Sequence, residues 1–149
     1  MTTEKQTPAI KLIAFAGICL ALAGCDKMSG DPTKALEKKL SALNAHFTSR
    51  SSDGKDVSYS ASATLDDVRK TDSTVAPFVA KINTIISHDS RVYIQQRTMS
   101  YKKAKWESVR VEDLAVPSSD DYANSDEYFK DNNDTMSALN TWLDRGINC

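Results

Sequence analysis

The side chains best suited to covalent chemistry in this chain are its cysteines and histidines. They are Cys19, Cys25 and Cys149, together with His46 and His88. Nucleophilic catalysis requires a base within hydrogen-bond reach of the nucleophile, often in a Gly-x-Ser-x-Gly string or as a cysteine paired with a histidine. No Gly-x-Ser-x-Gly string occurs, and we expect His46 at a helix end and His88 in a turn, with no catalytic role. The sequence therefore predicts no catalytic residue and favours a protein that is not an enzyme.

A run of acidic residues from Asp120 to Asp134 could supply oxygen ligands, which hard cations such as Ca²⁺ prefer. The calcium-binding EF-hand loop also needs a central glycine and a glutamate at its last position. The run contains no glycine. We therefore expect Asp120–Glu127 to be a solvated surface loop, and we expect neither a metal site nor a cofactor.

The beginning of the chain has the pattern of a secretory signal. Lys5 and Lys11 precede the apolar run Leu12–Ala23, which is too short to cross a bilayer, since a transmembrane helix needs about 20 apolar residues. An apolar region of about 7 to 15 residues is typical of a signal peptide. The run ends in Leu22-Ala23-Gly24-Cys25, which resembles the lipobox of bacterial lipoproteins. A conventional cleavage site with a coincidental cysteine is the alternative interpretation.

The lipobox resemblance implies the domain organisation and the cellular location. Residues 1–24 would be a cleaved signal peptide, 25–30 a lipidated tether, and 31–149 a single small globular domain. Cys25 would carry acyl chains such as palmitate, and two or more chains hold a protein firmly on a membrane. The protein would then belong to the cell envelope and face the periplasm. Asp26 resembles the residue that retains enterobacterial lipoproteins in the inner membrane.

Charge and cysteine content restrict the partners of the mature chain. Without residues 1–24 it keeps 17 basic and 19 acidic side chains, because the whole chain has 19 and 20 and the signal removes two and one. Nucleic-acid-binding domains are strongly basic, so we expect no nucleic-acid partner. Cys149 has no cysteine left to pair with inside the chain, so it is either a candidate for an intermolecular disulfide, as in a disulfide-linked dimer, or a terminal residue with no role.

The apolar pattern predicts helices at both ends of the domain and strands between them. A helix capped by Asp31 would carry its apolar residues at Leu36, Leu40, Leu43 and Phe47, and another would run from Asp134 to Gly146. Strict alternation predicts a strand at Val57–Leu65. The segment Val75–Ile86 fits a helix or a strand, and we prefer a strand because of its β-branched residues. The segments Arg91–Tyr101 and Lys105–Val111 form a predicted hairpin.

These elements predict an α+β fold in which the N-terminal helix packs on an antiparallel β-meander of about four strands. A short C-terminal helix completes the domain. The predicted hairpin interleaves basic and aromatic residues, and these form a candidate interaction surface for lipid headgroups or an acidic partner. The residues of this candidate surface are Arg97, Tyr101, Lys102, Lys103, Lys105 and Trp106. Its charges could instead only protect an exposed sheet edge from aggregation.

Three functions remain open from the sequence. The first is a non-enzymatic envelope lipoprotein that binds a protein partner as an accessory, exclusion or inhibitor factor. The second is a small-ligand carrier or hydrolase with a pocket between helix and sheet. The third is an inhibitor of cell-wall hydrolases that would use the acidic loop Asp120–Glu127.

Overall fold

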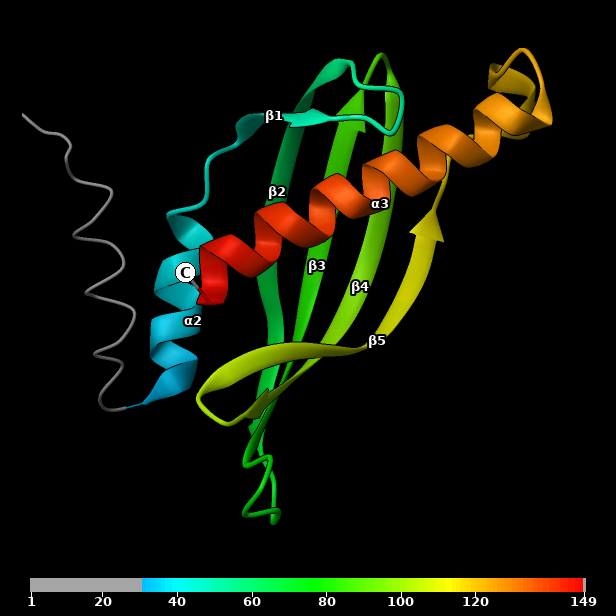
Figure 1. Cartoon of the computed structure of the whole chain (residues 1–149). Helices are drawn as coiled ribbons and strands as arrows, with labels where there is room; N and C mark the ends of the chain where they lie inside the picture. Colours follow the sequence, from blue (N-terminus) through cyan, green and yellow to red (C-terminus); the bar gives the residue numbers. More distant parts are fainter. Residues whose placement is uncertain (1–30, 149) are drawn as a thin grey trace, which may run out of the picture.

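The computed structural model describes residues 31–148, so the expectations for the signal peptide, the tether, Cys25 and Cys149 lie outside the described residues. The described part is an α+β fold in which helices flank one antiparallel sheet (Figure 1). The elements follow in the order α2 (Pro32–Ser41), β1 (His46–Arg50), β2 (Asp56–Lys70), β3 (Phe78–His88), β4 (Arg91–Lys102), β5 (Lys105–Ala115), the 3-10 helix η1 (Ser119–Asp121) and α3 (Ser125–Asn148).

The sheet is a meander of five strands in the order β1-β2-β3-β4-β5, and every neighbouring pair is antiparallel. The strands predicted from alternation at Val57–Leu65 and from β-branched residues within Val75–Ile86 are both present. The predicted hairpin is also present, as β4 and β5 joined through Lys103 and Ala104. Both linking residues have positive φ angles, of 53° and 61°, which suit the right-handed twist of a tight hairpin.

The first strand replaces the end of the predicted N-terminal helix, so the expected count of about four strands was too low. Asp31 caps α2 as expected, with its Oδ1 accepting a hydrogen bond from the Thr33 N–H at 2.9 Å. The helix nevertheless ends at Ser41, and Phe47 lies in β1. There its ring stacks on Tyr59 of β2 and on Trp142 of α3, with ring centroids 5.4 and 5.6 Å away. Packing across the sheet therefore prevails over the helical spacing.

The C-terminal helix is long, and it covers the sheet in place of the N-terminal helix. α3 crosses one face of the sheet, whereas α2 packs beside β2 and the C-terminal end of α3 (Figure 1). The helix begins nine residues before the predicted cap Asp134, with Asn124 Oδ1 accepting from the Glu127 N–H at 2.9 Å. Gly146 lies inside the helix, where an added Cβ would meet Leu43 Cδ2 at 1.9 Å. This glycine therefore permits close packing and does not end the helix.

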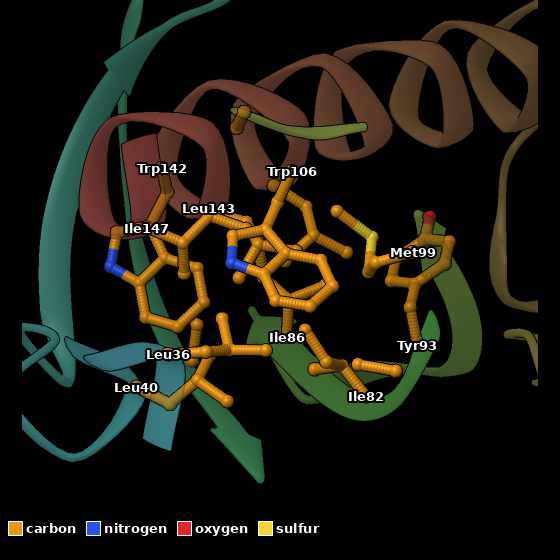
Figure 2. Close-up of a cluster of buried hydrophobic side chains, with 14 of the residues drawn as sticks. Leu36, Leu40, Ile82, Ile86, Tyr93, Met99, Trp106, Trp142, Leu143 and Ile147 are labelled. Carbon is orange, nitrogen blue, oxygen red and sulfur yellow. The ribbon is translucent and has the colours of Figure 1, made fainter. Parts of the chain in front are cut away.

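The hydrophobic core fills the space between α3, α2 and the inner face of the sheet (Figure 2). Alternate residues of the strands point into it, as the period of two in a strand requires. The aromatic members Trp106 and Tyr93 are 2% and 1% exposed. The aliphatic members labelled in the figure are Leu36, Leu40, Ile82, Ile86, Leu143 and Ile147.

Candidate functional site

A groove of about 630 Å³ runs between α3 and the inner side of the β4–β5 hairpin. This volume lies within the range of about 300–1,000 Å³ that small-molecule sites occupy. The groove is lined by buried side chains from both elements, namely Arg97, Met99, Trp106, Leu143 and Ile147. Charged residues surround these apolar groups: Lys105 and Glu107 come from β5, and Asp144 and Arg145 come from α3. The arrangement provides an apolar surface with one buried cation in it.

The buried cation is Arg97, which is only 4% exposed. Its Nη2 donates a hydrogen bond to Gln95 Oε1 at 3.1 Å, and its Nε has no hydrogen-bond partner among the described residues. Burial lowers the pKa of Arg97, and the charge of Asp113 acts in the opposite direction. An arginine side chain stays protonated in proteins even so. The groove therefore contains a positive charge with most of its donors unused.

Gln95 is fixed by neighbours that orient its carbonyl toward Arg97. Its Nε2 donates to Asp113 Oδ1 at 2.7 Å and contacts Met136 Sδ at 2.8 Å. Since both side-chain amide protons are thereby engaged, Oε1 remains as the acceptor that holds the guanidinium. The series Asp113, Gln95, Arg97 positions the cation along the inner face of β4.

The six residues of the predicted interaction surface do not share one surface, although Arg97, Lys105 and Trp106 all line the groove. Arg97 and Trp106 are buried, and Tyr101 is half-buried between Phe78 and the Trp106 ring. Lys102, Lys103 and Lys105 come together at the end of the hairpin, where Lys103 and Lys105 are exposed. Alternation within β4 places Arg97 on the inner face together with Tyr93, Gln95 and Met99. The prediction grouped the six residues by their nearness along the chain and did not separate the two faces.

The outer strand β5 is an edge of the sheet, because it pairs with β4 and with no other described strand. Ten of its eleven residues are exposed, and Trp106 is the exception. Aliphatic side chains remain exposed along the strand and just after it, namely Val109, Val111, Leu114 and Val116. An edge of this kind presents unpaired backbone groups next to apolar side chains.

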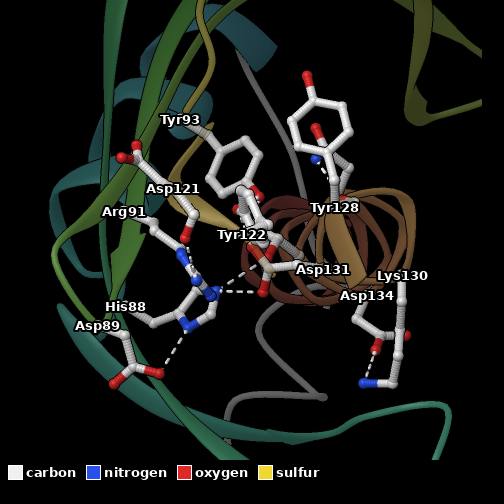
Figure 3. Close-up of polar contacts among 12 residues, drawn as sticks. His88, Asp89, Arg91, Tyr93, Asp121, Tyr122, Tyr128, Lys130, Asp131 and Asp134 are labelled. Carbon is white, nitrogen blue, oxygen red and sulfur yellow. Dashed lines mark hydrogen bonds and ion pairs between the residues drawn. The ribbon is translucent and has the colours of Figure 1, made fainter. Parts of the chain in front are cut away.

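A second polar cluster lies at the opposite end of α3, around His88 and Asp131 (Figure 3). The His88 side chain is 6% exposed, and its Nε2 lies 2.7 Å from Asp131 Oδ1. Its Nδ1 faces Asp89 Oδ2 at 3.5 Å. The Tyr59 ring meets the imidazole edge-on, with ring centroids 5.1 Å apart. His88 is thus a buried member of the structure, and it ends β3 directly before the turn at residues 89–90 instead of lying in the turn itself.

Two tyrosine hydroxyls complete the surroundings of Asp131. Tyr93 and Tyr122 donate to Asp131 Oδ2 at 2.6 and 2.5 Å. Burial raises the pKa of Asp131, but these hydrogen bonds and the charges of His88 and Arg91 outweigh it, so the net pKa is lowered. Burial and the nearby Asp131 raise the pKa of both phenols, that of Tyr122 to about 12. The carboxylate therefore joins α3 to β3, β4 and the segment after η1.

The acidic run from Asp120 to Asp134 is not one loop. Asp120 and Asp121 lie in η1, and Asp126 and Glu127 lie in the first turn of α3. Negative charge in that turn is favourable because it faces the positive end of the helix dipole. Within residues 31–148, no three or more metal-ligating side chains gather in one place. None of the described helices is long and apolar enough to cross a membrane. His46 is exposed on β1, with Nδ1 3.1 Å from Ser60 Oγ.

Comparisons with protein families, with curated proteins and with solved structures found no match to this chain.

Proposed function

We propose that this protein is a lipid-anchored protein of the cell envelope whose folded domain binds a partner protein and catalyses no reaction. It would act as an accessory or exclusion factor at the membrane surface. The observation that carries the proposal is the free edge of β5, where backbone groups of an eleven-residue strand adjoin four exposed aliphatic side chains. An extended segment of a partner can add to such an edge as a further strand.

The two edges of the sheet differ in a way that favours β5 as the contact. The opposite edge, β1, has five residues, and a short edge strand gives little backbone for pairing. β5 is longer, and Val109 and Leu114 are 60% and 55% exposed. The lysines at the end of the hairpin add positive charge beside it, which would steer an acidic partner or an anionic membrane toward this edge.

A position-specific crosslink tests the contact. A photoreactive amino acid at Val109 of the full chain in membranes should yield a crosslinked product, whereas the same amino acid at Ser62, exposed on β2, should not. Leu114→Asp should abolish the product from position 109 while circular dichroism stays unchanged. Equal products from both positions, or a product that persists in Leu114→Asp, would contradict the proposal.

The membrane anchor rests on Cys25 and needs a separate test. Labelled palmitate should enter the wild-type protein and not the Cys25→Ser variant, and the variant should leave the membrane fraction. Retention of the variant on membranes, with no label in the wild type, would exclude lipidation. If the host follows the enterobacterial rule, Asp26 places the anchor in the inner membrane, and density-gradient separation of the two membranes would locate it.

A small-ligand carrier is the second candidate function, and the groove beside Arg97 supports it. The groove lining contains no histidine and no cysteine. A hydrolase that used a nucleophile and a histidine base would therefore lack its base there. Between the two forms of this candidate, the carrier is favoured over the hydrolase.

Two further expectations can be tested cheaply. A disulfide-linked dimer through Cys149 should run at twice the monomer mass on a non-reducing gel and should disappear in Cys149→Ser. Inhibition of a cell-wall hydrolase would appear in a lysozyme assay. Its candidate segment, Asp120–Glu127, divides between η1, a short link and the start of α3.

A further inference from the structure

We propose that Arg97 forms an anion-binding site in the groove between α3 and β5, and that its ligand is a small monocarboxylic acid with an apolar body. This inference goes beyond the protein contact at the edge of β5, because the groove lies on the inner side of the strand and shares only Val111 with the aliphatic residues of that edge. The two proposals can therefore fail separately.

The first argument is the unused hydrogen-bonding capacity of a buried charge. A guanidinium has five N–H donors, and Arg97 uses one of them in the described structure, toward Gln95. Its Nε is shielded from solvent without a partner. No carboxylate of residues 31–148 forms an ion pair with it within 4.0 Å. Because a buried charge is costly unless it is paired, an anion from outside the chain would complete the site.

The second argument is the net charge of the groove lining, which determines how many negative charges the ligand should carry. The lining has three basic side chains, Arg97, Lys105 and Arg145, and two acidic ones, Glu107 and Asp144, so its net charge is +1. Asp113 acts on Arg97 from outside the lining and further reduces the positive charge there, so the site suits at most a single negative charge. A phosphate dianion would instead meet repulsion from the two carboxylates.

The third argument is the apolar surface next to the cation. Met99, Trp106 and Leu143 are each at most 4% exposed and line the groove together with Arg97. A carboxylate on the guanidinium would therefore place its attached chain against these side chains. An arginine that binds a carboxylate through two parallel hydrogen bonds also fixes the direction of that chain. Pockets with mostly apolar walls and few polar groups bind small molecules in this way.

The probe for this site is hexanoate, with the neutral hexanamide as its matched control. The full chain is held in phosphatidylcholine nanodiscs at pH 7.5 and labelled with 5-fluorotryptophan. The chain has two tryptophans, which gives one reporter in the groove, Trp106, and one outside it, Trp142. Hexanoate should shift the fluorine resonance of Trp106 in a saturable way and leave that of Trp142 unchanged. Hexanamide and inorganic phosphate should shift neither.

Variants then assign the effect to Arg97. Arg97→Gln should weaken hexanoate binding by about tenfold or more, as expected for the loss of a charge-assisted hydrogen bond. Arg110→Gln, at an exposed arginine of β5 outside the groove lining, is the matched control and should change binding by less than about threefold. If Arg97→Gln fails to fold, the comparison of hexanoate with hexanamide on the wild type decides. No shift of Trp106, equal shifts from both probes, or a stronger shift from phosphate would overturn the proposal.

Discussion

Two charged side chains of this domain, Asp131 and Arg97, are held in the interior in opposite ways. Asp131 receives hydrogen bonds from Tyr93 and Tyr122 and pairs with His88. Arg97 has one neutral partner, Gln95. A buried charge with all its partners in the same chain serves the fold, whereas one left without them costs stability. This difference identifies the cluster around Asp131 as structural and the surroundings of Arg97 as the candidate binding site.

The largest expected effect is the loss of the Asp131 cluster. Asp131→Ala leaves two tyrosine hydroxyls and His88 without their shared acceptor, so the free energy of unfolding should fall by about 2–4 kcal/mol. Urea unfolding followed by circular dichroism measures this change. Glu127→Ala, at an exposed residue of the same helix, is the matched control and should cost less than about 1 kcal/mol. Similar losses in both variants would mean that the cluster has no special role.

The sequence predicted the parts of the fold whose signal is local. Alternation at Val57–Leu65 and the Asp31 cap each act within a few residues, and both are present as predicted. Phe47 was misassigned because its spacing suits a helix, and only its contacts with Tyr59 and Trp142 reveal the strand. The first half of α3 was missed because it is largely polar. The residues of α3 that are buried in the core lie mainly in the second half of the helix.

The cluster around Asp131 could not be found from the sequence, because its members lie on different elements. His88 ends β3 and Asp131 lies on α3, so no spacing relates them. Arg97 was placed on an exposed surface because basic residues are rarely buried. Its burial follows from the alternation within β4, where Tyr93, Gln95, Arg97 and Met99 all face inward.

Acid should lower the free energy of unfolding through Asp131 by less than the Asp131→Ala substitution does. Because the pKa of Asp131 in the folded protein is below its ordinary value of 3.8, its ionised form contributes stability above that pH. The contribution is lost as the pH falls from 3.8 through the lower folded pKa. Asp131→Asn should therefore show a shallower decline of the free energy of unfolding with acid than the wild type. Parallel declines in the two proteins would show that other carboxylates dominate.

Replacement of Arg97 should not lower the free energy of unfolding, in contrast to replacement of Asp131. Arg97→Met keeps the length of the side chain and removes an incompletely paired buried charge. The free energy of unfolding should therefore be unchanged or rise by up to about 2 kcal/mol in the absence of ligand. Urea unfolding in ligand-free buffer measures it. A loss comparable with that of Asp131→Ala would show that Arg97 serves the fold, and the contrast between the two regions would then disappear.

The smallest effect on stability is expected at the end of the hairpin. Reversal of charge at Lys102, Lys103 and Lys105 should change the free energy of unfolding by less than about 0.5 kcal/mol for each exposed residue, because such sites make few contacts. Partner capture through β5 should nevertheless weaken, and the deficit should shrink as salt screens the charges over a Debye length of about 8 Å at physiological ionic strength. If capture of the partner is unchanged at low salt, these lysines only protect the sheet edge from aggregation. The contact would then depend on the aliphatic residues of β5 alone.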